Sequence, residues 1–468
     1  MLLFTGFGAA QVLSFVRNAL IGHALSKGDF GIAAAITIML QMVETLSDLG
    51  ADRMIMQARD GDTPRFLAAS HLLLAVRGAV LAAILFISAP AIAAAFGAAH
   101  AAAAFQIAAL APLIKGFMHL DFRVAQRGFD NRPQMLVDVV PQAAALLATW
   151  PLLMVTRDYS VVVALSCAQA AAATLLSHIL ARHPYRFAFD TGILTRQLQF
   201  GWPILASALP LVAVYQGDRM IIAHFAGVEA LANYTAAFMV TMVPALIAAK
   251  VGHALMLPLF SGNVRRGQPL AGKFRVASES VAVMAALYLS GFLVCGGAVL
   301  PLVFGPQYDQ LGPVTGWLAA MWAFRMLQSA PGMALMAHGE TKPFLIAGII
   351  RAAALPAVAY AAMNSAPLTT LAAIGCAFEA LSLAYITIRL ELLERGLGVI
   401  VASRAAFIGP AALLALVSAK ASPPETVYLI ATATCVLAVL AASAVAVMPS
   451  LNALARRAMR SRVQAEAV

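Results

Sequence analysis

Long apolar runs, separated by short polar links, dominate the chain from one end to the other. A helix needs about 20 mostly apolar residues to cross a bilayer, and it tolerates the Gly and Pro that most of these runs contain. The pattern predicts an all-α membrane bundle of about fourteen transmembrane helices, at residues 2–23, 30–55, 67–96, 98–118, 136–155, 160–181, 198–225, 230–260, 278–303, 311–337, 343–363, 367–388, 404–419 and 427–448.

The basic residues of the links give these helices an orientation. One alternate set of links, together with the C-terminal tail, carries twenty Lys and Arg residues, whereas the other set carries Lys27, Arg157 and Lys420. Cytoplasmic links hold the excess of Lys and Arg in membrane proteins. The sequence therefore predicts a multi-pass protein of the plasma (inner) membrane with both termini in the cytoplasm.

Composition and motifs exclude several other classes of protein. The chain is 62% hydrophobic and 11% charged, whereas soluble domains carry about 25% charged residues. Its net charge of +10 does not indicate a nucleic-acid partner, because the basic residues lie mostly in short links. No GxxxxGK[ST], HExxH, GxSxG or CxxC motif is present, and the nine histidines show no metal-ligand spacing. We expect no enzymatic activity, no cofactor and no metal site.

The sequence also contains a weak internal repeat. Residues 17–35 resemble residues 219–237 at an offset of 202, with Arg17 aligned to Arg219. Two six-helix halves of the same orientation are a transporter architecture. The predicted organisation is an N-lobe of helices 1–6, a C-lobe of helices 7–12, two added helices and a basic tail, at residues 1–182, 183–403, 404–449 and 450–468.

Charged residues deep within the apolar runs are the candidate site. A charge at the centre of a transmembrane helix costs about 2.5–3.5 kcal/mol on the insertion scale, so it needs a partner or a polar cavity. The deep bases outnumber the deep acids and predict a cationic cavity for phosphate or diphosphate, which arginine binds through bidentate bonds. The bases are Arg17, Arg77, Arg219, Lys250, Arg325 and Arg351, and the acids are Glu44, Asp48, Asp218 and Glu379.

The acids allow two interpretations. Glu44, Asp48 and Asp52 are spaced i, i+4 and i+8, which predicts one stripe on the second helix. Such a stripe is either a site for a coupling proton or cation, or the counter-charge of neighbouring bases. The same choice applies to Asp218 and Glu379.

Several short segments resemble one known family. Residues 13–21 (LSFVRNALI), 25–33 (LSKGDFGIA) and 44–51 (ETLSDLGA) carry the match, and residues 218–222 (DRMII) and 234–238 (YTAAF) echo it in the second half. The chain resembles the polysaccharide-transporter branch of the multidrug/oligosaccharidyl-lipid/polysaccharide exporter superfamily, the bacterial flippases for lipid-linked oligosaccharides.

The resemblance implies a function. It predicts alternating access by two lobes around a cationic cavity, and passage of a polyprenyl-diphosphate-linked oligosaccharide from the cytoplasmic to the outer leaflet for surface polysaccharide biosynthesis. Membrane lipid, a polysaccharide polymerase and glycosyltransferases are the expected partners. The alternative is a cation-coupled multidrug antiporter of the same superfamily, which needs an acidic cavity and finds its support in Glu44, Asp48 and Asp52.

Overall fold

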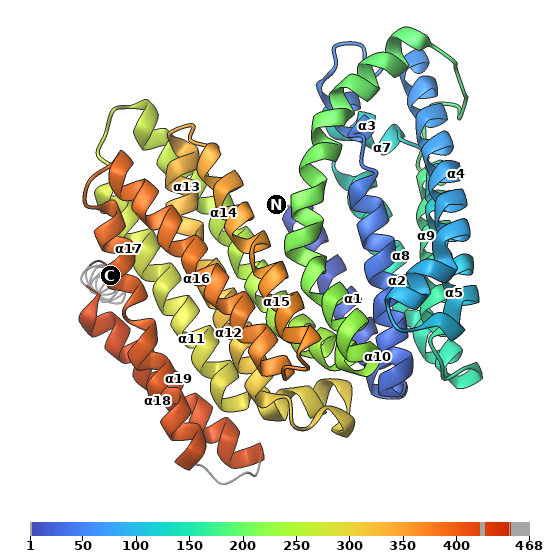
Figure 1. Cartoon of the computed structure of the whole chain (residues 1–468). Coiled ribbons are helices and arrows are strands. Elements are labelled where there is room, and N and C mark those ends of the chain that lie inside the picture. The colour runs from blue at the N-terminus through green and yellow to red at the C-terminus, as the bar shows by residue number, and fades with distance from the viewer. Residues whose placement is uncertain (1, 422–425, 449, 451–468) are drawn as a thin grey trace, which may run out of the picture. The chain divides into compact units, whose positions relative to one another are not determined.

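The computed structural model describes residues 2–421, 426–448 and 450, and the regular elements among them are all helices (Figure 1). Contacts divide the chain into two compact units, Met1–Ala236 and Ala237–Val468, which we name unit 1 and unit 2. The predicted lobes, with their boundary after residue 182, are defined by helix order and orientation rather than by contacts, so they stay a prediction.

Unit 1 contains four strongly packed helix pairs. α1 packs against α8, α8 against α9, and α4 against both α5 and α6. The unit contains α1 (Leu2–Ala24), α2 (Lys27–Leu46), α3 (Ala51–Gln57), α4 (Pro64–Ala95), η1 (Ala99–Ala101), α5 (Ala102–Ala108), α6 (Leu110–Gly116), α7 (Asp121–Arg127), α8 (Arg132–Val155), α9 (Ser160–Ile179) and the first part of α10 (Thr191–Arg265).

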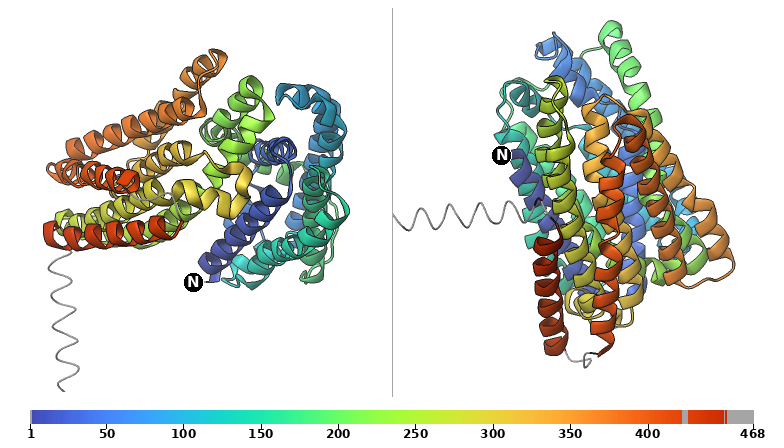
Figure 2. Two further views of the ribbon diagram at one scale, coloured as in Figure 1. Left: turned by 90° about the horizontal axis from the view of Figure 1, so that it is seen from below. Right: turned by 90° about the vertical axis from the view of Figure 1, so that its left-hand side faces the viewer.

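Unit 2 is a bundle in which α12 packs against both α11 and α16 (Figures 1 and 2). α18 and α19 pack on α11 as well. The unit contains the rest of α10, α11 (Ala271–Phe304), η2 (Pro306–Tyr308), α12 (Gly312–Leu327), α13 (Ser329–Ala337), α14 (Lys342–Ala352), α15 (Ala354–Met363), α16 (Leu368–Leu393), α17 (Leu397–Ala405), α18 (Ile408–Ala421) and α19 (Thr426–Val447).

These helices confirm the predicted fold class and a multi-pass membrane protein. Each predicted apolar run is helical over most of its length, although several runs are broken into shorter helices. Among the described residues, nine helices are long and apolar enough to cross a bilayer, or ten if the bent pair Ala99–Gly116 and Asp121–Arg127 forms one crossing. The predicted number of fourteen crossings stays a prediction.

The turn after α2 corrects one expectation. α2 ends at Leu46, and in the turn that follows, the Asp48 carboxylate accepts a hydrogen bond from the backbone N–H of Gly50 (2.9 Å). Gly50 has a φ of +61°, a conformation that glycine adopts at little cost. The prediction of one continuous stripe was therefore wrong: Glu44 lies on α2, Asp48 in the turn, and Asp52 on α3.

The core of unit 1 surrounds one face of α2. Ile32, Ile36 and Met39 recur at helical spacing and are almost fully buried, together with Leu85 of α4 and Phe105 of α5. In a membrane these side chains stabilise the unit through close packing rather than through removal from water, because lipid tails are equally apolar. This packing holds the opposite, polar face of α2 toward the site.

A second glycine allows α2 and α10 to touch through their backbones. α10 consists of two helices joined at Gly227, whose φ of 85° and ψ of 175° suit glycine alone. Beside this kink, a Cβ added to Gly31 of α2 would lie 1.9 Å from the carbonyl oxygen of Val228. The start of α2 therefore packs directly against the kink in α10.

Substituting Gly31 should destabilise unit 1. Gly31→Ala forces the two backbones apart, and overpacking of this kind lowers the free energy of unfolding by about 1–3 kcal/mol. Thermal unfolding of the purified protein in detergent measures the loss. The matched control is Gly8→Ala in α1, where an added Cβ meets no heavy atom within 4 Å. An unfolding midpoint for Gly31→Ala equal to that of the control contradicts the close contact.

Candidate functional site

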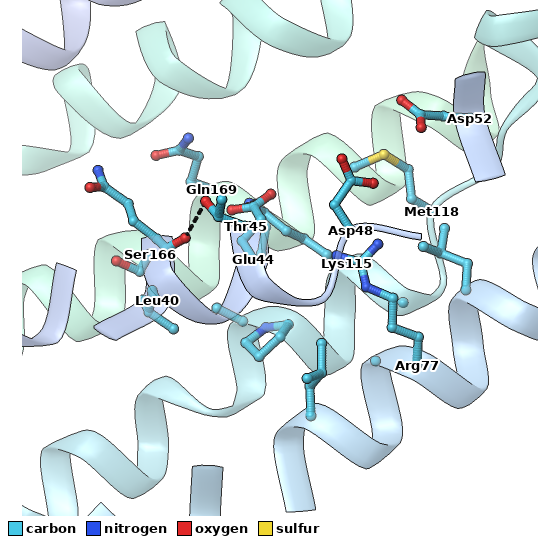
Figure 3. Close-up of a pocket in the computed structure, with 18 of the residues that line it drawn as sticks. Leu40, Glu44, Thr45, Asp48, Asp52, Arg77, Lys115, Met118, Ser166 and Gln169 are labelled. Carbon is cyan, nitrogen blue, oxygen red and sulfur yellow. Dashed lines mark hydrogen bonds and ion pairs between the residues drawn. The ribbon is translucent and has the colours of Figure 1, made fainter. Parts of the chain in front are cut away.

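Unit 1 encloses a cavity of about 580 Å³ between α1, α2, α4, α6 and α9, which continues to α3 and α7. Figure 3 shows Glu44, Asp48, Arg77 and Lys115 gathered at its centre. Several uncharged polar side chains also line it, namely Asn18, Thr37, Gln41, Thr45, Ser166 and Gln169. A polar chamber inside an apolar helix bundle is the expected setting for a hydrophilic ligand.

The cavity carries an excess of positive charge. Five basic side chains line it against three acidic ones, which leaves two positive charges over, the bases being Arg17, Arg53, Arg77, Lys115 and Arg123 and the acids Glu44, Asp48 and Asp52. Three of the bases form ion pairs with the three acids, at 2.9 Å for Lys115–Glu44, 2.8 Å for Arg53–Asp48 and 2.9 Å for Arg123–Asp52.

Arg17 and Arg77 account for the excess. The guanidinium of Arg17 donates to the side-chain oxygens of Gln169 (2.6 Å) and Gln142 (3.4 Å). Arg77 donates from Nε to the hydroxyl of Ser47 (3.2 Å). These partners are neutral, and no ion pair joins either arginine to a carboxylate in the part of the chain that the structure describes. Both guanidiniums can therefore take a phosphate oxygen.

Arg219 and Asp218 lie elsewhere in unit 1. Arg219 is buried on α10 and donates to the backbone carbonyl oxygen of Tyr215 (2.6 Å). The carboxylate of Asp218 accepts a hydrogen bond from the hydroxyl of Tyr234 (2.7 Å). The lining of the unit 1 cavity includes neither residue.

Unit 2 contains a compact buried charge network. The carboxylate of Glu379, 2% exposed, pairs with Arg325 at 2.7 Å and with Arg351 at 2.9 Å. Gln328 donates to the same carboxylate (3.0 Å) and accepts a hydrogen bond from Arg351. Arg325 also lies over the ring of Trp322. The network ties α12, α14 and α16 together.

The six predicted cations thus occupy several places. Arg17 and Arg77 lie in the unit 1 cavity, Arg325 and Arg351 share Glu379 in unit 2, and Arg219 and Lys250 lie at separate positions of α10. Of the predicted acids, Glu44 and Asp48 line the cavity. Their joint role in binding substrate or a coupling ion stays a prediction.

Sequence reasoning missed part of the cavity lining. Lys115 lies near the end of an apolar run and Arg123 lies in a link, so the rule for deep charges selects neither. Gln41 and Gln169 also line the cavity and were not predicted. Amide side chains in the middle of apolar runs are a usable signal, since a polar group in the bilayer needs a partner or a cavity.

Two ion pairs connect the start of α10 to neighbouring segments. One joins it to the link between α3 and α4, and the other joins it to α4. Arg196 donates both guanidinium N–H groups to Asp60 (2.9 Å each), and this hydrogen bonding holds the pKa of Asp60 below its usual value. Arg65 pairs with Asp190 at 2.6 Å. The backbone N–H of Ile193, followed by the charge of Arg65, lowers the pKa of Asp190. Both carboxylates stay ionised at neutral pH.

An aromatic cluster of three histidines and Tyr185 also lies in unit 1. Ring centroids of His71 and His119 lie 4.6 Å apart, those of His71 and Tyr185 4.4 Å, and those of His178 and Tyr185 4.7 Å. The ring nitrogens of His71 and His119 accept backbone N–H groups of Leu120 and of Asp121, respectively. In the described ranges, no group of three or more His, Cys, Asp and Glu could hold a metal ion.

Comparison with known sequences places a family model over most of the chain. Residues 23–313, more than half of the chain, match the family described as "Polysaccharide biosynthesis protein". A curated relative is the teichuronic acid biosynthesis protein TuaB of Bacillus subtilis (strain 168), which is 22% identical over 335 residues. That alignment covers 70% of this chain and 68% of the relative.

Two solved structures share the fold. The lipid II flippase MurJ, in an inward closed conformation, aligns with a TM-score of 0.71 at 9% identity over 94% of this chain and 98% of its own. An inward-facing multidrug resistance MATE family transporter of the MOP superfamily gives 0.68 at 13% identity, over 82% and 96%. The predicted transporter fold is confirmed, and at these identities the likeness concerns the fold alone.

The network around Glu379 predicts a large stability effect. Glu379→Gln keeps the shape of the side chain but removes the charge that Arg325 and Arg351 share, and breaking a buried ion pair in this way costs about 3–5 kcal/mol. The control is Asp309→Asn at an exposed position of unit 2. Thermal unfolding in detergent should show a much lower midpoint for Glu379→Gln and an unchanged one for the control. Equal midpoints would contradict a stabilising network.

Proposed function

The chain belongs to the polysaccharide biosynthesis protein family, and from this premise we propose that it is a flippase for a polyprenyl-diphosphate-linked oligosaccharide. It moves this lipid from the cytoplasmic to the outer leaflet of the bacterial inner membrane, for surface polysaccharide biosynthesis. Its relative is named for the biosynthesis of teichuronic acid, and a protein of the same fold is named a lipid II flippase.

The observation that carries the proposal is the excess of two positive charges in the unit 1 cavity. Arg17 and Arg77 bind the diphosphate, since a guanidinium forms short, charge-assisted hydrogen bonds with phosphate oxygens. Gln41, Ser166 and Gln169 supply donors and acceptors for sugar hydroxyls. The headgroup crosses through this polar space while the polyprenyl tail stays in the lipid.

The remaining elements of the proposal follow the predicted architecture. The two lobes expose the cavity alternately to each side, and both termini lie in the cytoplasm. Glu44, Asp48 and Glu379 serve as counter-charge, which agrees with their ion pairs, and Asp218 serves the same purpose on α10. Glycosyltransferases supply the lipid-linked substrate and a polymerase extends the exported glycan.

A second candidate is a cation-coupled multidrug antiporter. A multidrug transporter shares the fold, and Glu44, Asp48 and Asp52 all line the cavity. Each of these carboxylates is neutralised by a base, however, and the surplus charge is positive. Organic cations are repelled by such a cavity, so the flippase is the favoured function.

Reversing one cavity charge should abolish transport without loss of the protein. Arg17→Glu and Arg77→Glu each replace a phosphate ligand by a repelling charge. Loss of one charge-assisted hydrogen bond alone is worth about 1.5–3 kcal/mol, which is roughly a 10- to 100-fold loss of affinity. Surface glycan in a complemented deletion strain is the measurement, beside an immunoblot of the membrane fraction. Arg157→Glu, on the exposed link between α8 and α9, is the matched control. Normal export from both cavity variants would remove these residues from the site.

Deleting the gene separates the two candidate functions. The flippase predicts loss of a surface glycan, accumulation of its lipid-linked precursor, and unchanged sensitivity to cationic drugs. The antiporter predicts the reverse pattern, with normal glycan and increased drug sensitivity. Complementation with the wild-type gene restores the lost phenotype in either case.

A further inference from the structure

The ion pair between Lys115 and Glu44 differs from the other pairs of the cavity. Lys115, at the end of α6, donates from Nζ to both carboxylate oxygens of Glu44 on α2, at 2.9 Å each (Figure 3). The two side chains have no other hydrogen-bond partner among the described residues. Neither side chain is therefore held in place by a further hydrogen bond in the described part of the chain.

In each of the other two pairs, one partner has an additional structural contact. Asp48 pairs with Arg53 and also accepts the backbone N–H of Gly50, which closes the turn after α2. The partner of Asp52 is Arg123, which also donates to the side chain of Gln126 and lies over the ring of Phe122. Each of these pairs is therefore connected to the local fold through one partner, whereas Glu44 and Lys115 bond only to each other among the described residues.

Exposure to the cavity makes the Lys115–Glu44 pair weak. The side chain of Glu44 is 58% exposed, against 31% for Asp48 and 30% for Asp52. Exposed ion pairs contribute little net free energy, because water screens them and two flexible side chains are held in place. A doubly charged diphosphate attracts an ammonium group more strongly than a single carboxylate does.

Lys115 is placed beside Arg77 by direct contact between helix backbones. A Cβ added to Gly78 of α4 would lie 2.8 Å from the Cα of Gly116 in α6. These glycines directly follow Arg77 and Lys115 in the sequence, so the two cations leave adjacent points of two touching helices. The charge of Glu44 acts on Arg77 as well as on Lys115.

We propose that the Glu44 carboxylate occupies the site on Lys115 at which a substrate phosphate binds, and that the diphosphate of the lipid-linked substrate displaces this carboxylate. Lys115 then becomes a third cation for the diphosphate, beside Arg77 and Arg17. Glu44 acts as a selectivity residue, since a ligand must offer more negative charge than one carboxylate to displace it. A diphosphate meets this requirement better than a monophosphate. This inference rests on the proposed function and deepens it.

Binding to the purified protein in detergent tests the exchange. The probes are a polyprenyl diphosphate and the corresponding monophosphate. Glu44→Gln removes the competing charge and should bind the diphosphate roughly twofold to fivefold more tightly than the wild type. Lys115→Met should bind it more weakly and lose preference for the diphosphate. In the double variant, the gain from Glu44→Gln should vanish. A Glu44→Gln variant that binds no more tightly than the wild type overturns the proposal.

Asp52→Asn is the matched comparison, because it removes the same charge from the same cavity but leaves Arg123 with its contacts to Gln126 and Phe122. A gain equal to that of Glu44→Gln shows a general field effect and also overturns the proposal. Unfolding midpoints confirm that each variant is folded. The two hypotheses fail separately: a wild type that does not bind the diphosphate contradicts the proposed function, whereas tight wild-type binding that Glu44→Gln leaves unchanged contradicts only the exchange.

Discussion

A charged side chain that leaves water for the interior of an apolar helix bundle loses hydration free energy that counter-charge, hydrogen bonds or a wet cavity must restore. In unit 2, ion pairs with Glu379 compensate for the lost hydration of Arg325 and Arg351. Unit 1 restores it with a polar cavity, in which Arg17 and Arg77 have neutral partners. In the proposed function, the diphosphate of the substrate supplies counter-charge to these two arginines, which connects the fold to a phosphate-bearing substrate.

The turn after α2 determines how that cavity is charged. Because Gly50 turns the chain between α2 and α3, Asp52 lies on a short separate helix and meets Arg123 of α7. A continuous helix would have placed the three acids on one stripe of α2. The observed break distributes them among three bases from different elements, so the acids neutralise part of the cavity and leave a defined positive excess.

Much of the fold followed from the apolar runs, since their length alone determines where helices form in a membrane protein. The helix breaks did not, because the turn at Gly50 involves a single side-chain cap and the kink at Gly227 lies beside a close approach of Gly31 to Val228. The rule for charges within apolar runs found Arg17, Arg77, Glu44 and Asp48. It missed Lys115 and Arg123, whose positions near run ends look like surface positions. The histidine cluster joins residues far apart in the sequence and leaves no local pattern.

Transport in reconstituted vesicles tests the central claim most directly. A polyprenyl-diphosphate-linked oligosaccharide with a fluorescent sugar is placed in vesicles that contain the purified protein, and an impermeant quencher reports its leaflet. The account predicts protein-dependent movement of this lipid, with no comparable movement of an uncharged polyprenol-linked oligosaccharide. Equal movement of both lipids, or movement of neither, would contradict a cavity that recognises the diphosphate.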